Sequence, residues 1–151
     1  AQALYYFAFG SNMDPQQMAT RCPGAPSLGP AYLKDHALSF RGPSQKRGGG
    51  VLSVDPEIGA TVSGVLYRVQ SDHLEALDRF EGAPQWYVRA QVIVRDRQRQ
   101  RFSATVYRLP SQVTAMEPTA AYLEQVLNAC QLHGFDTAPV LRAAARISRS
   151  V

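Results

Sequence analysis

The sequence predicts an α+β fold in which a small mixed β-barrel carries helices packed on its outside. The middle of the chain contains several short apolar runs separated by glycine, proline and aspartate, and such a series of strands favours a closed or highly twisted sheet. The last third changes to a helical period, with apolar side chains at Tyr122, Leu123, Val126, Leu127 and Cys130. With 151 residues, of which 45% are hydrophobic, the chain is expected to form one domain, residues 1–151, with a sizeable core.

The first predicted element is a buried strand, which the alternating apolar run before residue 10 indicates. The Gly-Ser-Asn sequence at residues 10–12 then tolerates a tight turn. Asp14 followed by Pro15 is typical of a helix start, and a short helix is predicted over residues 14–21. Because the first N–H groups of a helix lack internal partners, this arrangement can form an anion or oxyanion pocket. On spacing alone, an ordinary strand-to-helix turn is the commoner arrangement.

Three further strands are predicted before the next helix, at residues 31–41, 51–54 and 61–69. Residues 55–59 contain proline and glycine and are expected to form a turn between the second and third of these strands. The glycine-rich and basic stretch at residues 42–50 is expected to be a mobile loop that borders the functional site.

A short amphipathic helix is predicted over residues 71–80, because Ser71 is a typical cap and apolar residues recur at helical spacing. Gly82 is a natural helix stop, and a strand is predicted over residues 86–94. Glu81 therefore lies at a helix C-terminus, where the helix dipole disfavours a carboxylate and raises its pKa. Such a group suits a general base, although a solvated surface glutamate is the commoner explanation of any single Glu.

The remaining predicted elements are a strand at residues 102–107 and two helices, at residues 118–133 and 137–147.

The net charge of +4 raises the question of a nucleic-acid partner, and the densest basic run lies at residues 95–101. This run is best interpreted as a solvated hairpin tip whose charges limit aggregation. An arginine-rich RNA-binding barrel is an alternative that rests on charge alone, because no aromatic interleaving or nucleic-acid motif accompanies the run.

Other classes of site find little support in the sequence. The two cysteines, Cys22 and Cys130, argue against a disulfide scaffold and favour a reducing, cytoplasmic location. Neither the cysteines nor the three histidines show metal-ligand spacing, and no nucleotide-binding loop or dinucleotide fingerprint is found. No apolar run reaches the length of a membrane span, and no signal peptide is recognised. We therefore expect no metal, no cofactor, no nucleic-acid partner and no membrane association.

Four stretches of the chain, in the right order, resemble motifs of the γ-glutamylcyclotransferase family. The first is the strand and loop at residues 6–13, which match the pattern Y-F-A-Y-G-S-N-L, and the second is the basic, glycine-rich entry into a strand at residues 47–52. The third is the pattern L-D-x-x-E-G at residues 77–82, followed by an aromatic-Tyr-Val strand at residues 86–88. The fourth is the pattern P-x-x-x-Tyr at residues 118–122. The resemblance covers nearly the whole chain and implies the same small barrel with outer helices.

The resemblance also implies an activity: cyclisation of a γ-glutamyl amino acid or amine to 5-oxoproline, with release of the free amine. The α-amine of the substrate attacks its own side-chain amide, Glu81 serves as general base and then general acid, and no cofactor is required. The turn at residues 10–12 can offer N–H groups and the Ser11 hydroxyl to the oxyanion. The implied substrate-binding residues are Tyr6, Phe7, Ala8, Phe9, Gly10, Ser11, Asn12, Tyr87 and Tyr122. The expected partner is a small γ-glutamyl substrate; the oligomeric state is open, with a homodimer as one possibility.

Two positions depart from the family pattern. The loop tyrosine of the family is Phe9 here, so any hydrogen bond from that hydroxyl is missing, and Met13 replaces a leucine of similar volume. The loop sequence F-G-S-N-M is closest to the branch that acts on γ-glutamyl amino acids. A non-catalytic protein of the same fold, binding a small amino-acid-like ligand or a protein, is the competing hypothesis; Phe9 favours it and Glu81 counts against it.

Overall fold

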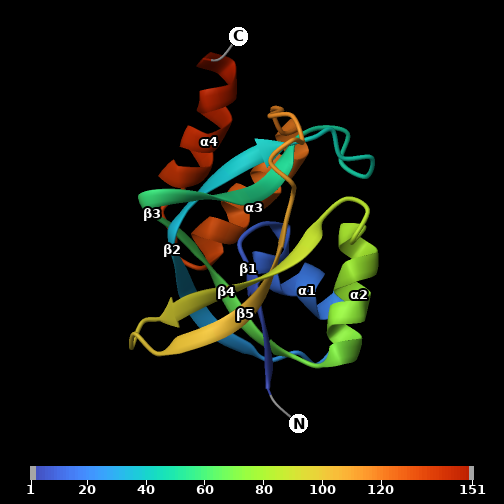
Figure 1. Ribbon diagram of the computed structural model, residues 1–151, viewed down its shortest axis with the longest axis vertical. Helices are drawn as coiled ribbons and strands as arrows, with labels where there is room; N and C mark the ends of the chain where they lie inside the picture. Colours follow the sequence, from blue (N-terminus) through green and yellow to red (C-terminus); the bar gives the residue numbers. More distant parts are fainter. Residues whose placement is uncertain (1–2, 150–151) are drawn as a thin grey trace.

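Five strands close into a barrel in the computed structural model, which describes residues 3–149 (Figure 1). The strands are β1 (Leu4–Ala8), β2 (Ser27–Arg41), β3 (Val51–Val69), β4 (Val88–Asp96) and β5 (Arg101–Arg108). Around the barrel they follow the order β1-β3-β2-β4-β5, in which β5 pairs with β1 in parallel and the other neighbours pair antiparallel. The predicted mixed barrel is confirmed. The predicted domain of residues 1–151 also includes four terminal residues that lie outside the described range.

Helices pack on the outside of this barrel. They are the 3₁₀ helix η1 (Ser11–Met13) and the α-helices α1 (Pro15–Arg21), α2 (Ser71–Glu81), α3 (Ala120–Leu132) and α4 (Ala138–Arg149). Helix α1 contacts α2, α3 contacts η1, and α4 contacts β2. Figure 1 shows α2 on the same side of the molecule as the loop between β2 and β3. No helix within residues 3–149 has the length and apolar character needed to cross a membrane.

The core of the barrel is filled by apolar side chains from all its strands. Phe7 on β1 is fully buried, and its ring packs against the backbone of Gly64 on β3. A Cβ added to Gly64 would lie 2.5 Å from the carbonyl oxygen of Ala8 and 2.6 Å from the Phe7 ring, so no larger residue fits there. The last pair of the β1–β3 ladder joins Ala8 to Val65, after which the chain leaves the sheet and forms η1. The close packing of β1 on β3 therefore fixes where the turn begins.

The prediction of two strands at residues 51–54 and 61–69 is wrong, because the structure has the single strand β3 over both. The predicted turn at residues 55–59 coincides with a break in the pairing of β3 with β2, where Lys34 pairs with Thr61 but His36 pairs with Pro56. Residues 57–60 thus lie outside the regular register. Gly59 has a φ of +89°, and its N–H donates to Asp35 Oδ1 over 3.0 Å. Proline and glycine here produce a bulge within a strand and not a chain reversal.

The ends of helices α1 and α2 position the site. Asp14 accepts a hydrogen bond from the N–H of Gln16 over 3.0 Å, and Pro15 is the first helical residue, as predicted. The predicted Ser71 cap is wrong: the N-cap of α2 is Gln70, and Ser71 is already helical. At the other end Gly82 adopts a left-handed conformation with a φ of +69°, so α2 ends at the preceding residue. The Glu81 side chain therefore projects from the last residue of α2.

Candidate active site

Two adjacent cavities meet at Glu81. The inner chamber has a volume of about 30 Å³, enough for a small polar group, and the outer pocket has a volume of about 440 Å³, which is in the range of small-molecule sites. The residues that line both cavities are Ser11, Glu81, Tyr87 and Tyr122. A ligand that fills the outer pocket and reaches into the chamber must therefore pass the Glu81 carboxylate.

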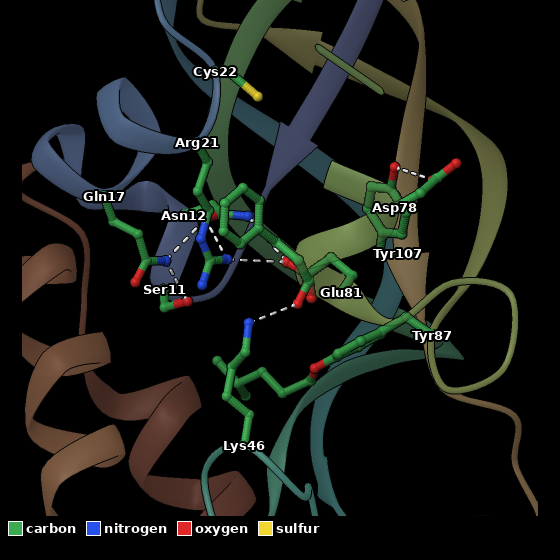
Figure 2. Close-up of polar contacts among 12 residues, drawn as sticks. Ser11, Asn12, Gln17, Arg21, Cys22, Lys46, Asp78, Glu81, Tyr87 and Tyr107 are labelled. Atoms are coloured by element: carbon green, nitrogen blue, oxygen red, sulfur yellow. Dashed lines mark hydrogen bonds and ion pairs between the residues drawn. The ribbon is translucent and has the colours of Figure 1, made fainter. Parts of the chain in front are cut away.

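The Glu81 carboxylate is held by one amide and one guanidinium. Asn12 Nδ2 donates a hydrogen bond to Glu81 Oε1 over 3.1 Å, and Arg21 Nη1 lies 3.5 Å from the same oxygen (Figure 2). Both contacts use Oε1. Within the described part of the chain Oε2 has no such contact, so it can exchange a proton with a ligand. Burial raises the pKa of the Glu81 carboxyl above its ordinary value, against the opposing effects of Arg21, Lys46, the Asn12 hydrogen bond and Arg47.

Asn12 is the residue that links the first loop to Glu81. Its Nδ2 also donates to Tyr6 Oη over 2.8 Å, while its Oδ1 accepts from Gln17 Nε2 over 2.9 Å and from Arg21 Nη1 over 3.1 Å. All four hydrogen-bonding positions of this buried amide are thus occupied. The acceptors and donors around it fix its orientation, with the nitrogen toward Glu81 and the oxygen toward α1. Figure 2 shows Asn12 between these groups.

Ser11 presents a hydroxyl to the cavities from the start of η1. Its Oγ accepts hydrogen bonds from Gln17 Nε2 over 2.7 Å and from Arg47 Nη2 over 3.5 Å. Because the oxygen is used as an acceptor, the hydroxyl proton is available for a ligand. The turn that carries it is a 3₁₀ turn, closed by hydrogen bonds of 3.0 Å from Met13 N to the Gly10 carbonyl and from Asp14 N to the Ser11 carbonyl.

Two buried tyrosines bracket the backbone of Leu52 at the wall shared by the cavities. The N–H of Leu52 donates to Tyr122 Oη over 3.1 Å, and Tyr87 Oη donates to the Leu52 carbonyl over 2.8 Å. The proton of Tyr87 is therefore used within the protein, whereas that of Tyr122 can be donated to a ligand. Burial raises the pKa of Tyr122 to about 12, so this hydroxyl remains a donor near neutral pH.

A second network supports the wall of the chamber and the last turn of α2. Tyr107 on β5 donates to Asp78 Oδ1 over 2.6 Å, and Arg89 on β4 contacts both oxygens of Asp78, at 2.7 and 2.6 Å. Although burial raises the pKa of Asp78, the hydrogen bonds from Arg89 and Tyr107 lower it more, so the carboxyl has a pKa below its ordinary value. Asp78 lies one turn before Glu81, and it therefore fastens the end of α2 to two strands of the barrel.

The structure brings most of the predicted site residues together. The inner chamber is lined by Tyr6, Phe9, Gly10, Ser11, Asn12, Leu52, Glu81, Tyr87, Tyr107 and Tyr122. Phe7 and Ala8 do not line either cavity, because both side chains are buried in the core. Within residues 3–149 no cluster of three or more His, Cys, Asp or Glu side chains is placed to bind a metal ion.

Sequence reasoning missed the residues that reach the site from other elements. These are Arg21 on α1, Lys46 and Arg47 in the loop between β2 and β3, Arg79 on α2, and Tyr107 on β5. The loop at residues 42–50 does border the outer pocket, as predicted. Its basic composition was the available signal for Lys46 and Arg47, whereas no sequence pattern pointed to Arg21 or Tyr107.

The chain is similar to known proteins over most of its length. A family model described as "Gamma-glutamyl cyclotransferase, AIG2-like" matches residues 6–125. A gamma-glutamylcyclotransferase of Bos taurus is 25% identical over 138 residues, which are 88% of this chain and 73% of the relative; one of Mus musculus is 26% identical over the same shares. A solved structure titled "Gamma-glutamyl cyclotransferase" superposes with a TM-score of 0.82 at 25% identity, covering 88% of this chain and 81% of the other.

Proposed function

Because this chain belongs to the γ-glutamyl cyclotransferase, AIG2-like family, we propose that it converts a γ-glutamyl amino acid or amine to 5-oxoproline and a free amine. The α-amine nitrogen of the γ-glutamyl group attacks the carbon of its own side-chain amide. A new C–N bond closes the five-membered ring, and the bond from that carbon to the leaving nitrogen breaks. The substrate supplies both reacting groups, so the protein has to hold the cyclic conformer and move protons.

Glu81 is the proposed proton carrier in both halves of the reaction. Its carboxylate takes a proton from the attacking amine, and the resulting carboxylic acid gives a proton to the leaving nitrogen. A pKa raised by burial suits this role, since the carboxylate is then a stronger base than that of an exposed glutamate. The contacts of Asn12 and Arg21 with Oε1 support Oε2 as the oxygen that exchanges the proton.

The developing oxyanion is proposed to lie near the first turn. The hydroxyls of Ser11 and Tyr122 both accept hydrogen bonds from the protein, which leaves their protons for a ligand oxygen. The first N–H groups of η1 are further donors, because they have no partner within a helical turn. The reaction as written requires no metal and no organic cofactor.

The observation that carries this proposal is the position of Glu81 at the junction of the two cavities. A group that must reach both the attacking amine and the leaving nitrogen has to lie between the γ-glutamyl group and the rest of the substrate. The observation that favours the non-catalytic alternative is Phe9. This residue lines the inner chamber but lacks the hydroxyl that its family counterpart carries. A binding protein, however, has no need of a base at this junction.

The test is incubation with γ-glutamyl-alanine, with separate quantification of 5-oxoproline and alanine. We expect both products in equal amounts, and neither in a matched reaction with Glu81→Gln. Release of glutamate with alanine would instead indicate hydrolysis by water. Saturable binding of the dipeptide without any product would support the non-catalytic alternative and overturn the proposal.

A further inference from the structure

The outer pocket has a strong excess of positive charge. Its basic lining residues are Arg21, Lys46, Arg47 and Arg79. Among the described residues that line this pocket, Glu81 supplies the only carboxylate. Its contact with Arg21, at 3.5 Å, offsets one of the four cations. The charge of the other three has no such acidic partner in the pocket.

Arg47 is a half-buried cation whose contacts are with neutral groups. Its guanidinium donates to Gln125 Oε1 over 3.1 Å, to Gln17 Oε1 over 3.4 Å and to Ser11 Oγ over 3.5 Å. It also lies 5.1 Å from the centre of the Tyr122 ring. These contacts orient the guanidinium at the edge of the chamber without neutralising it. Within the described part of the chain Arg47 forms no ion pair within 4.0 Å, and such an oriented cation attracts a carboxylate.

Lys46 and Arg79 stand on the more exposed side of the pocket. Lys46 Nζ donates to the carbonyl of Phe80 over 3.2 Å and lies 5.3 Å from the centre of the Phe80 ring, both neutral groups. Arg79 follows Asp78 on α2, but the Asp78 carboxylate is bound by Arg89 at 2.6 Å. Neither Lys46 nor Arg79 forms an ion pair within 4.0 Å in the described part of the chain. Both are therefore available to an anionic ligand.

We propose that the preferred substrate is a γ-glutamyl dipeptide whose leaving group is an acidic amino acid. The inference rests on the proposed function and adds the chemical class of the leaving group. The three cations Lys46, Arg47 and Arg79 match three carboxylates. A neutral leaving amino acid gives the dipeptide only two, one on the γ-glutamyl group and one on the leaving residue, whereas glutamate or aspartate adds the third. A leaving amine would bring only one.

The cavities determine which part of the substrate meets these cations. The inner chamber, at about 30 Å³, has room only for a small polar group, so the leaving residue must occupy the outer pocket of about 440 Å³. Cleavage breaks the amide C–N bond, and Glu81 gives its proton to the leaving nitrogen. The two carboxylates of the leaving residue take no part in the chemistry, and they interact with the cations before and after cleavage. They therefore contribute to recognition.

The experiment compares γ-glutamyl-glutamate with γ-glutamyl-glutamine, which has the same shape and one charge fewer, and with γ-glutamyl-alanine. γ-Glutamyl-glutamate has one carboxylate more than either comparison dipeptide, and an exposed ion pair contributes a factor of about 1.5 to 5, so we predict a kcat/KM about 1.5- to 5-fold higher for the acidic dipeptide. The ratio should fall toward one at about 0.5 M salt, because these pairs are partly exposed. Lys46→Gln and Arg79→Gln should each bring this ratio closer to one. Arg97→Gln, which removes the same charge at the exposed hairpin tip, should leave it unchanged.

The outcomes separate this inference from the proposed function. Cyclisation of all three dipeptides at equal kcat/KM would overturn the inference and leave the proposed function intact. If the preference for γ-glutamyl-glutamate persisted in Lys46→Gln and Arg79→Gln, these cations would not be its cause, and that part of the inference would be overturned. No 5-oxoproline from any of the three would overturn the proposed function and the inference with it.

Discussion

Replacing Glu81 with glutamine removes the proposed base with the smallest change in shape. The amide has the same length, and its Oε1 can still accept the hydrogen bond that Asn12 Nδ2 donates over 3.1 Å. It cannot accept a proton from the substrate amine at neutral pH. General acid–base groups contribute about 10²–10⁴-fold, and Glu81 is proposed to serve both proton transfers, so we expect turnover to fall by roughly 10³–10⁴-fold.

The same substitution should leave the fold at least as stable at neutral pH. Burial is the largest cause of the raised pKa of Glu81, so the folded protein holds this proton more tightly than the unfolded chain does. The resulting contribution to stability is fully present below the unfolded pKa and is lost as the pH rises through the folded pKa. Glutamine does not titrate, so the Tm of Glu81→Gln relative to the wild type should rise between pH 4 and pH 8. In a chain of this size, about 1 kcal/mol corresponds to about 2–4 °C.

The measurement pairs Tm with 5-oxoproline formation on one preparation of each protein. Glu75→Gln is the matched control, because Glu75 is exposed on the same helix and lines neither cavity. A folded Glu81→Gln variant with near-normal turnover would remove Glu81 from the mechanism. A variant that melts more than about 4 °C below the wild type at pH 8 would show that the ionised carboxylate stabilises the fold, contrary to the argument from burial.

Three further predictions concern the substrate, the cofactor requirement and the support of the base. The mechanism consumes the free α-amine, so N-acetylated γ-glutamyl-alanine should give no alanine; its release would indicate a water nucleophile. Activity should survive exhaustive chelation, and loss of turnover that one divalent metal restores would contradict the proton-carrier mechanism. Asp78→Asn weakens a partly exposed ion pair with Arg89 and the bond from Tyr107, and should lower Tm by about 2–4 °C and kcat more than KM. An unchanged kcat would show that this network does not position Glu81.

The parts of the site that lie within a single stretch of sequence could be predicted. Asp14 and Pro15 started α1, and Gly82 ended α2 after Glu81, because caps and left-handed glycines depend on only a few neighbouring residues. Ser71 failed as a cap because His73 Nδ1 accepts the N–H of Gln70, which starts the helix one residue earlier. Local signals thus predicted correctly that Glu81 lies at a helix end, but they did not predict the first residue of that helix.

The contacts between distant stretches could not be derived from local patterns. Asn12 and Glu81 are 69 residues apart, and only the closure of the barrel brings the end of β1 to the end of α2. The same closure brings Tyr107 to the chamber and the loop at residues 42–50 to the outer pocket. The long strand β3 was missed for a related reason: its bulge at Gly59 has the composition of a turn, and only its partner strand β2 shows that the chain continues.

The pKa of Glu81 depends on burial and on the nearby cations. The sequence predicted the direction of the shift from the helix dipole, whereas in the structure burial is the largest cause and the cations Arg21, Lys46 and Arg47 oppose it. Lys46 and Arg47 are also among the three cations proposed to bind the carboxylates of the substrate. A bound acidic residue would offset their effect on Glu81, and the pKa of the carboxyl would then rise further in the complex. The base would thus become more basic when its substrate is in place, which couples the proposed specificity of the outer pocket to the proposed proton transfer at its inner end.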